Sequence, residues 1–157
     1  MMPKRSGGDW LLEGIAAAAV IAASAEIAMQ WNALPAKIPV HFGIHGEANG
    51  WGGRNSLIML LGATVVMFVL LTIAETQQRL VNIPVRVNRD APEAKRLIRS
   101  LAITLKAVLA AGFFWITHVT IAIAMGERSG MGRVFLPVFL IAVFVPVVYY
   151  IVRLKKL

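Results

Sequence analysis

The sequence contains no cysteine among its 157 residues. This absence excludes disulfide bonds, thiolate metal sites, cysteine nucleophiles and lipid attachment through a thiol. Motifs of hydrolytic enzymes are missing as well, because the chain has no HExxH, no GxSxG and no glycine-rich loop that could cradle a phosphate. From these absences we expect neither enzymatic activity nor a bound cofactor.

Charged residues are scarce. They make up 15% of the chain, whereas 58% of the residues are hydrophobic and the mean hydropathy is +0.71. A water-soluble domain needs more polar surface than this composition can supply. The sequence therefore predicts an integral membrane protein, organised as one membrane domain over residues 1–157.

The charge balance is basic, with 16 Lys and Arg against 8 Asp and Glu. The basic residues flank apolar segments and form no patch interleaved with aromatic side chains, so nucleic acid is not an expected partner. Anionic lipid headgroups on the cytoplasmic face of a bilayer are the expected counter-charge.

Four apolar segments are long enough to cross a bilayer, whose hydrocarbon core of roughly 30 Å requires about 20 helical residues. They cover residues 10–32, 57–74, 101–125 and 134–152. The sequence predicts an all-α fold, a membrane four-helix bundle in which a long structured extracytoplasmic loop, residues 33–56, joins the first two helices.

Basic residues gather on one side of this predicted bundle. Eleven of them lie in the N-terminal segment, in residues 75–100 and at the C-terminus, and four lie in the two connections on the opposite side. Because cytoplasmic loops carry the excess of Lys and Arg, we expect both termini and residues 75–100 in the cytoplasm and residues 33–56 outside. Lys106, in the third span, is expected to snorkel toward the headgroups, and Asp90 is expected to cap the start of that helix.

Residues 34–55, LPAKIPVHFGIHGEANGWGGRN, form a polar island between the first two spans. Pro35 and Pro39 break the helix, and five glycines permit turns that other residues resist. A plain connection needs far fewer residues. We therefore expect a formed lid over the outer ends of the helices, with Trp51 at the membrane interface and His41 turned toward the bundle near Glu26.

The same stretch carries a specific motif, W-x-x-LP-x-x-IP-x-HFG-x-x-G-x-x-NGWG-x followed by a basic residue. Its members here are Trp31, Leu34, Pro35, Ile38, Pro39, His41, Phe42, Gly43, Gly46, Asn49, Gly50, Trp51, Gly52 and Arg54. With this motif, residues 10–75 resemble the small bacterial membrane domain of unknown function found at the N-terminus of Sdp immunity proteins, whose namesake protects cells from a sporulation-delaying toxin. The better-studied members are longer and have further membrane helices.

This resemblance implies a multi-spanning protein of the bacterial inner membrane. It also implies a role in immunity to a secreted toxin, or in signalling that holds a cytoplasmic repressor at the membrane. The motif does not reveal what its residues do chemically, so they are considered individually.

The loop supplies the candidate ligand-binding or partner-binding residues. These are His41, Phe42, His45, Glu47, Asn49, Trp51 and Arg54. Three of them, His41, His45 and Glu47, carry imidazole and carboxylate donors suited to zinc or copper. Three close donors in a loop are nevertheless weak evidence for a metal site, because His41 can hydrogen-bond to a neighbour while the other two are solvated. No metal is therefore expected.

Two ionisable residues are predicted inside the bilayer. Glu26 and His118 lie about seven residues from the outer ends of the first and third spans, which places both at a depth on the order of 10 Å. Gly14, Ala18 and Ala22 precede Glu26 and predict a face that packs closely against another helix. We expect Glu26 and His118 to face each other or a shared pocket, where they would fix packing, contact a ligand or move a proton.

Three classes of function stay open. One is an immunity or sensing protein whose outer loop recognises an extracytoplasmic peptide or a membrane partner, and another is an assembly subunit of a larger complex or a homo-oligomer. The third is a small proton-coupled transporter, which needs a continuous polar path; its inner half offers only Glu13, Thr72 and Lys106. Copurification of a partner would favour the subunit, and solute or proton flux would favour the transporter.

Overall fold

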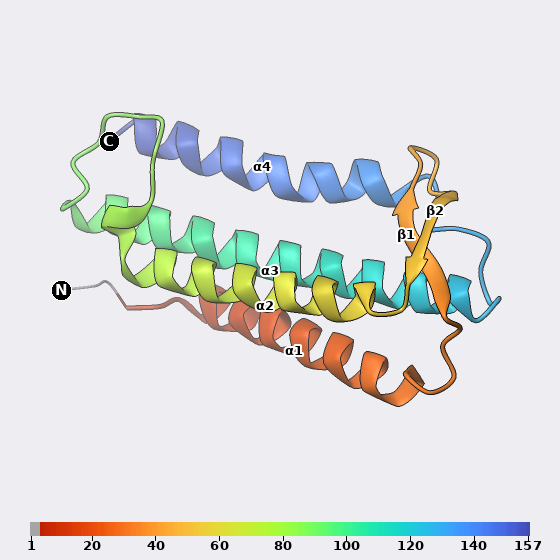
Figure 1. Ribbon diagram of the computed structural model, residues 1–157. Helices are drawn as coiled ribbons and strands as arrows, with labels where there is room; N and C mark the ends of the chain where they lie inside the picture. The colour runs from red at the N-terminus through yellow and green to blue at the C-terminus, as the bar shows by residue number, and fades with distance from the viewer. Residues whose placement is uncertain (1–3) are drawn as a thin grey trace.

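The computed structural model describes residues 4–157 and shows a bundle of four long helices with a small hairpin at one end (Figure 1). In chain order the elements are α1 (Gly7–Gln30), β1 (Lys37–Phe42), β2 (Ala48–Gly53), α2 (Ser56–Thr76), the 3-10 helix η1 (Gln78–Leu80), α3 (Pro92–Ala124) and α4 (Phe135–Lys155). All four α-helices are long and apolar enough to cross a membrane. The predicted spans are confirmed as helices, and the chain is a multi-pass membrane protein.

The start of α3 differs from the prediction that Asp90 caps it. The helix begins at Pro92 and its N-cap is Ala91. Proline lacks an N–H, has a φ angle suited to the first helical position and favours an extended residue before it, so the cap falls on Ala91. The Asp90 carboxylate instead forms an ion pair with Lys95, with 3.2 Å between Oδ1 and Nζ.

α3 is the central helix of the bundle. It packs against α1 and α2 on one side and against α4 on the other (Figure 1). Where α1 meets α3, Ala16 and Ala19 of α1 pack with Ala107 and Ala110 of α3. Small side chains allow helix backbones in a membrane protein to approach closely. These four residues are referred to below as the alanine layer.

The face of α1 that packs in the bundle is not the predicted one. Its buried apolar residues are Ala16, Ala19, Ala23 and Ile27. The predicted strip of Gly14, Ala18 and Ala22 lies on the adjacent face, where Gly14 and Ala18 are exposed. Residues 16–19 are all alanine, so small-residue spacing alone does not identify which side of this helix is buried.

The predicted loop between α1 and α2 folds into a β-hairpin, which corrects the all-α prediction in this segment. β1 and β2 pair antiparallel, with Lys37 opposite Gly53 and Phe42 opposite Ala48, and the register is irregular between Pro39 and Phe42. Both strands of a two-stranded sheet are edge strands, where proline and glycine are tolerated. The residues that predicted a loop are therefore compatible with a hairpin.

The hairpin and the chain ends lie at opposite ends of the bundle (Figure 1). η1 and the connection to α3 lie at the same end as the C-terminus, and apolar residues of that connection, Ile83, Val85 and Val87, pack near Leu97 and Leu154. The segment predicted to be cytoplasmic is thus an ordered cap on the bundle. Which end faces the cytoplasm stays a prediction.

Candidate functional site

The base of the hairpin is fixed to the end of α1 by Arg54. Its Nη1 donates to the carbonyl oxygens of Trp31 at 3.2 Å and Leu34 at 3.5 Å. The guanidinium also lies over the Trp31 ring, 5.0 Å from its centroid, which adds a cation-π contact. An aromatic and a basic residue of the motif, Trp31 and Arg54, therefore hold the hairpin in place.

The apolar members of the motif seat the hairpin on the helices. Leu34 and Ile38 are buried and pack in one cluster with Ile27 of α1, Leu57 of α2 and Ile121 of α3. Burial of large aliphatic side chains contributes about 1.5–3 kcal/mol each. The motif thus encodes the attachment of the hairpin to three helices.

The tip of the hairpin is fixed to the connection between α3 and α4. The amide of Met131 donates to the carbonyl of Gly46 at 2.7 Å, and Glu47 pairs with Gly130 as an isolated antiparallel bridge. Gly46 has a φ of 83°, and a Cβ placed on it would lie 2.6 Å from the carbonyl oxygen of Gly132. Only glycine fits this conformation and this close approach of two backbones without strain.

His41 and Glu26, which were predicted to lie near each other, have different hydrogen-bond partners, because Glu26 is paired with His118. The His41 side chain is exposed, and its Nδ1 hydrogen-bonds to Oδ1 of Asn49 on the facing strand. The register irregularity after Pro39 places both Val40 and His41 on exposed positions. His41 and Asn49 therefore form a polar pair on the surface of the hairpin.

The other candidate residues of the loop lie on or near the hairpin tip. His45 and Glu47 are exposed, and the Glu47 carboxylate lies over Gly43, where an added Cβ would meet Oε1 at 2.1 Å. Within residues 4–157 no three His, Asp or Glu side chains come together in a group that could hold a metal ion. Trp51 is 56% exposed.

A groove of about 260 Å³ lies between the hairpin and the helices, and we call it the hairpin groove. His41 and Phe42 line it from β1, Ile116 from α3, and Phe135 and Phe139 from α4. Apart from His41, the lining residues are apolar or glycine. Two of the predicted binding residues, His41 and Phe42, thus border one surface depression.

Glu26 and His118 form the pair that their shared depth predicts. Oε1 of Glu26 and Nδ1 of His118 are 2.8 Å apart. The Glu26 side chain is 19% exposed and the His118 side chain 43% exposed, so the pair lies at the flank of the contact between α1 and α3. The rings of Phe114 and Trp115 lie beside the imidazole.

A second polar group lies in the other half of the bundle. Glu13, Thr72 and Lys106 were named as the polar residues of the inner half, but their contact with one another and with Glu75 was not predicted. Lys106 does not snorkel to the headgroups, because its side chain is 0% exposed. Its Nζ is 2.8 Å from Oε1 of Glu13, 3.4 Å from Oε1 of Glu75 and 3.1 Å from Oγ1 of Thr72. The contact with Glu13 is an ion pair, whereas the contact with Thr72 has the geometry of a hydrogen bond.

Arg5 completes this group, which we call the charge cluster: Arg5, Glu13, Glu75 and Lys106. Nη2 of Arg5 donates to Oε1 of Glu75 at 2.8 Å and lies 4.0 Å from Oε1 of Glu13. The cluster joins two cations to two carboxylates and is formally neutral. A sequence signal existed, since Glu13 and Lys106 are ionisable residues within predicted spans, Glu75 directly follows another span, and buried charges require partners.

The two polar groups are separated by packed apolar side chains. The alanine layer lies between Lys106 and His118 along α3, and Met67, Phe68 and Phe114 pack against it. Apolar interiors of this kind exclude water. The charge cluster and the Glu26–His118 pair are therefore two sites and not one continuous polar path.

Comparison with known proteins finds one family model similar to part of the chain. Residues 17–72 match the family described as Domain of unknown function (DUF1648). The matched region comprises most of α1, the hairpin and most of α2. No curated protein and no solved structure shows significant similarity to the chain. Fold and match together define a multi-pass membrane protein that carries this small domain.

Proposed function

We propose that the chain is a bacterial inner-membrane protein of the Sdp-immunity-like class that recognises an extracytoplasmic peptide or a membrane partner through its hairpin. The observation that carries the proposal is a hairpin fixed at both base and tip that still presents large side chains to its surroundings. Those side chains are Val40, His41, Ile44 and Trp51. A connection without a recognition role has no need of such a surface.

The rigidity of the hairpin supports this role. Binding to a flexible segment costs about 0.5–1.5 kcal/mol for each side chain that becomes ordered, and a fixed surface avoids part of that cost. Arg54 at the base and Gly46 at the tip supply the attachment. We infer that the ligand meets a largely preformed site.

The hairpin groove indicates the chemistry of the ligand. Its apolar lining suits an aliphatic or aromatic side chain of a peptide, and His41 offers one polar contact. Because Asn49 occupies Nδ1 of His41, Nε2 is the nitrogen that a ligand would meet. A hydrophobic peptide with one hydrogen-bonding group matches this arrangement.

The distribution of basic residues supports the orientation in which the hairpin is outside. Eleven basic residues lie toward the end with η1 and the C-terminus, against four toward the hairpin end. The positive-inside rule then places the hairpin on the extracytoplasmic side, where a secreted peptide is accessible. Both termini are cytoplasmic in this arrangement.

A second candidate function is an assembly subunit, and the position of α4 favours it. α4 packs mainly against α3, and none of its most apolar 18-residue window is buried. Lipid covers such a face in a monomer, whereas a partner helix covers it in a complex. A proton-coupled transporter is less well supported, since the alanine layer separates the two polar groups.

The test of recognition is substitution of the two most informative hairpin residues. We expect His41→Ala and Trp51→Ala each to reduce protection by at least tenfold in a challenge with a secreted peptide toxin, or to abolish partner capture from the membrane, because each removes part of the binding surface. Both residues are exposed, so the variants should insert and fold normally.

Leu11→Ala is the control. Leu11 is 67% exposed and lies near the start of α1, at the opposite end of the bundle, so its loss should leave protection unchanged. Retention of full activity by both hairpin variants would show that the hairpin is a structural cover, and the recognition proposal would have to be abandoned.

A further inference from the structure

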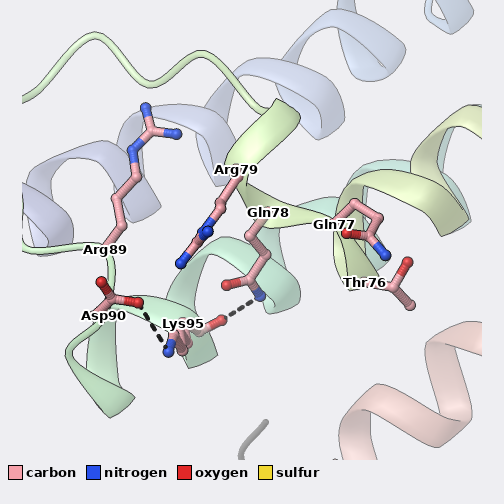
Figure 2. Close-up of a pocket in the computed structure, with 7 residues that line it drawn as sticks. All are labelled: Thr76, Gln77, Gln78, Arg79, Arg89, Asp90 and Lys95. Atoms are coloured by element: carbon pink, nitrogen blue, oxygen red, sulfur yellow. Dashed lines mark hydrogen bonds and ion pairs between the residues drawn. The ribbon is translucent and has the colours of Figure 1, made fainter. Parts of the chain in front are cut away.

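A hollow of about 370 Å³ lies where α2 ends, at the end of the bundle opposite the hairpin (Figures 1 and 2). Three cationic side chains line it, Arg79, Arg89 and Lys95, together with one carboxylate, Asp90. The amides of Gln77 and Gln78 add hydrogen-bonding groups. None of its lining residues belongs to the hairpin or to the charge cluster.

The walls of the hollow are held by specific hydrogen bonds. Nε2 of Gln78, a buried residue, donates to the backbone carbonyl of Lys95 at 2.7 Å and so joins η1 to α3 (Figure 2). Nη1 of Arg89 donates to the backbone carbonyl of Val81 at 2.8 Å. These contacts fix the chain before and after the connection, so the cations are presented from an ordered frame.

The charges in the hollow do not balance. Lys95 is paired with Asp90 at 3.2 Å, which leaves the two guanidinium groups without a carboxylate among the lining residues. Figure 2 shows Arg79 extending from η1 toward Lys95 and Asp90, across the space between η1 and α3. A concave surface with net positive charge attracts an anion, and the planar guanidinium matches two oxygens of a phosphate at once.

The position of the hollow along the bundle suits a lipid phosphate. α2 has 21 residues, which at 1.5 Å per residue correspond to about 31 Å, the thickness of a bilayer's hydrocarbon core. Thr76 is both the last residue of α2 and a lining residue of the hollow. The hollow therefore begins where the apolar span ends, at the level of the headgroups.

We propose that this hollow is a phosphate-binding site, in which Arg79 is the principal ligand and Arg89 and Lys95 complete the positive field. Its occupant is a phosphate group carried by an anionic lipid headgroup or by a soluble molecule. The proposal differs from general attraction between basic residues and a membrane, because it assigns binding to one hollow and to particular residues. It is independent of recognition by the hairpin.

The test uses the full-length protein in neutral detergent with phosphatidylcholine. Thermal unfolding is followed while phosphatidylglycerol is added, and the lipid concentration that gives half of the rise in Tm is recorded. Arg79→Gln should raise that concentration about tenfold or more, because it removes the charge-assisted hydrogen bonds of the guanidinium to the phosphate. Asp90→Asn should lower it, since that change removes the single negative charge of the hollow.

Arg86→Gln is the matched control. Arg86 is exposed, belongs to the same connection and does not line the hollow, so its substitution removes an equal charge without touching the site. Equal effects of Arg79→Gln and Arg86→Gln would show a diffuse electrostatic attraction and overturn the proposal. A parallel titration with inorganic phosphate identifies the source of the ligand. If inorganic phosphate alone raises Tm and the rise depends on Arg79, the ligand is soluble. If only phosphatidylglycerol gives a rise in Tm that depends on Arg79, the ligand is the lipid headgroup.

Discussion

At Lys106 a formal positive charge is fully buried among apolar helices. Removal of a charge from water costs several kcal/mol, and this cost is recovered only when partners with good geometry are present. Glu13 and Glu75 supply the carboxylates, and Arg5 balances the second of them. The charge cluster therefore specifies how the start of α1, the middle of α3 and the end of α2 come together.

Loss of the Lys106 charge should destabilise the bundle strongly. We expect Lys106→Met to lower the free energy of unfolding by about 3–5 kcal/mol, because it leaves the carboxylates of Glu13 and Glu75 with one cation, Arg5, between them. The measurement is equilibrium unfolding in detergent. Lys37→Met is the control, since Lys37 is an exposed lysine and its loss should change little.

A second variant separates charge balance from simple loss of packing. Combining Lys106→Met with Glu13→Gln removes one cation and one anion and leaves the Arg5–Glu75 pair intact. This double variant should recover part of the lost stability. A single Lys106→Met variant as stable as the native protein would refute the structural role given to the cluster.

The sequence predicted one of the two polar groups inside the bundle. Glu26 and His118 lie at matching depths on helices that run in the same direction, and depth alone sufficed to pair them. Which residues contact Lys106 is determined by the rotation of three helices about their axes. Arg5 was not considered because it lies before the predicted first span. Hydropathy carries no information about that rotation, so Lys106 was assigned to the interface.

Among the elements, the helices were predictable and the hairpin was not. Uninterrupted apolar runs require helices in a bilayer, because every backbone group must be paired within the segment. Between α1 and α2, Pro39 and the glycines obscured the alternation that normally identifies a strand. The contact between the hairpin tip and the connection before α4 joins Glu47 to Gly130, residues far apart in sequence, and no local pattern predicts it.

A substitution that adds one methyl group to Gly46 tests the contact at the hairpin tip. Gly46→Ala forces a left-handed conformation on a residue with a side chain, which costs about 1–2 kcal/mol, and also brings its Cβ against the backbone of Gly132. We expect the amide of Met131, which donates to Gly46, to exchange roughly 5–30 times faster with deuterium. Native-state hydrogen exchange measures this directly.

Gly53→Ala is the control for that experiment. Gly53 lies in the same hairpin, has no positive φ and has open space around the position of a Cβ. Its substitution should leave the exchange of the Met131 amide close to the native rate. Unchanged exchange in Gly46→Ala would mean that the tip is not held by this contact.

For the whole molecule, the fold places the hairpin at one end and the termini and η1 at the other. This division follows from the number of spans, because an even number of helices returns the chain to the side on which it began. The sequence therefore predicted which segments share a side. The assignment of those sides to the cytoplasm and the exterior depends on the distribution of Lys and Arg.

Single cysteines test that assignment, and the absence of native cysteine makes the experiment unambiguous. Ala48→Cys, in the hairpin, should react with a membrane-impermeant maleimide in intact cells. Ala91→Cys, before α3, should react only after the membrane is opened. The reverse pattern of labelling would invert the topology and place the hairpin in the cytoplasm.

The alanine layer also has a consequence for the cell that carries this protein. A membrane protein with ionisable residues in both halves is at risk of conducting protons and of dissipating the electrochemical gradient across the membrane. Here the Glu26–His118 pair and the charge cluster are separated by Ala16, Ala107 and their neighbours, whose packed apolar side chains offer no proton acceptor. The bundle should be electrically tight, so a cell can keep it in the membrane continuously, even when nothing is bound to the hairpin.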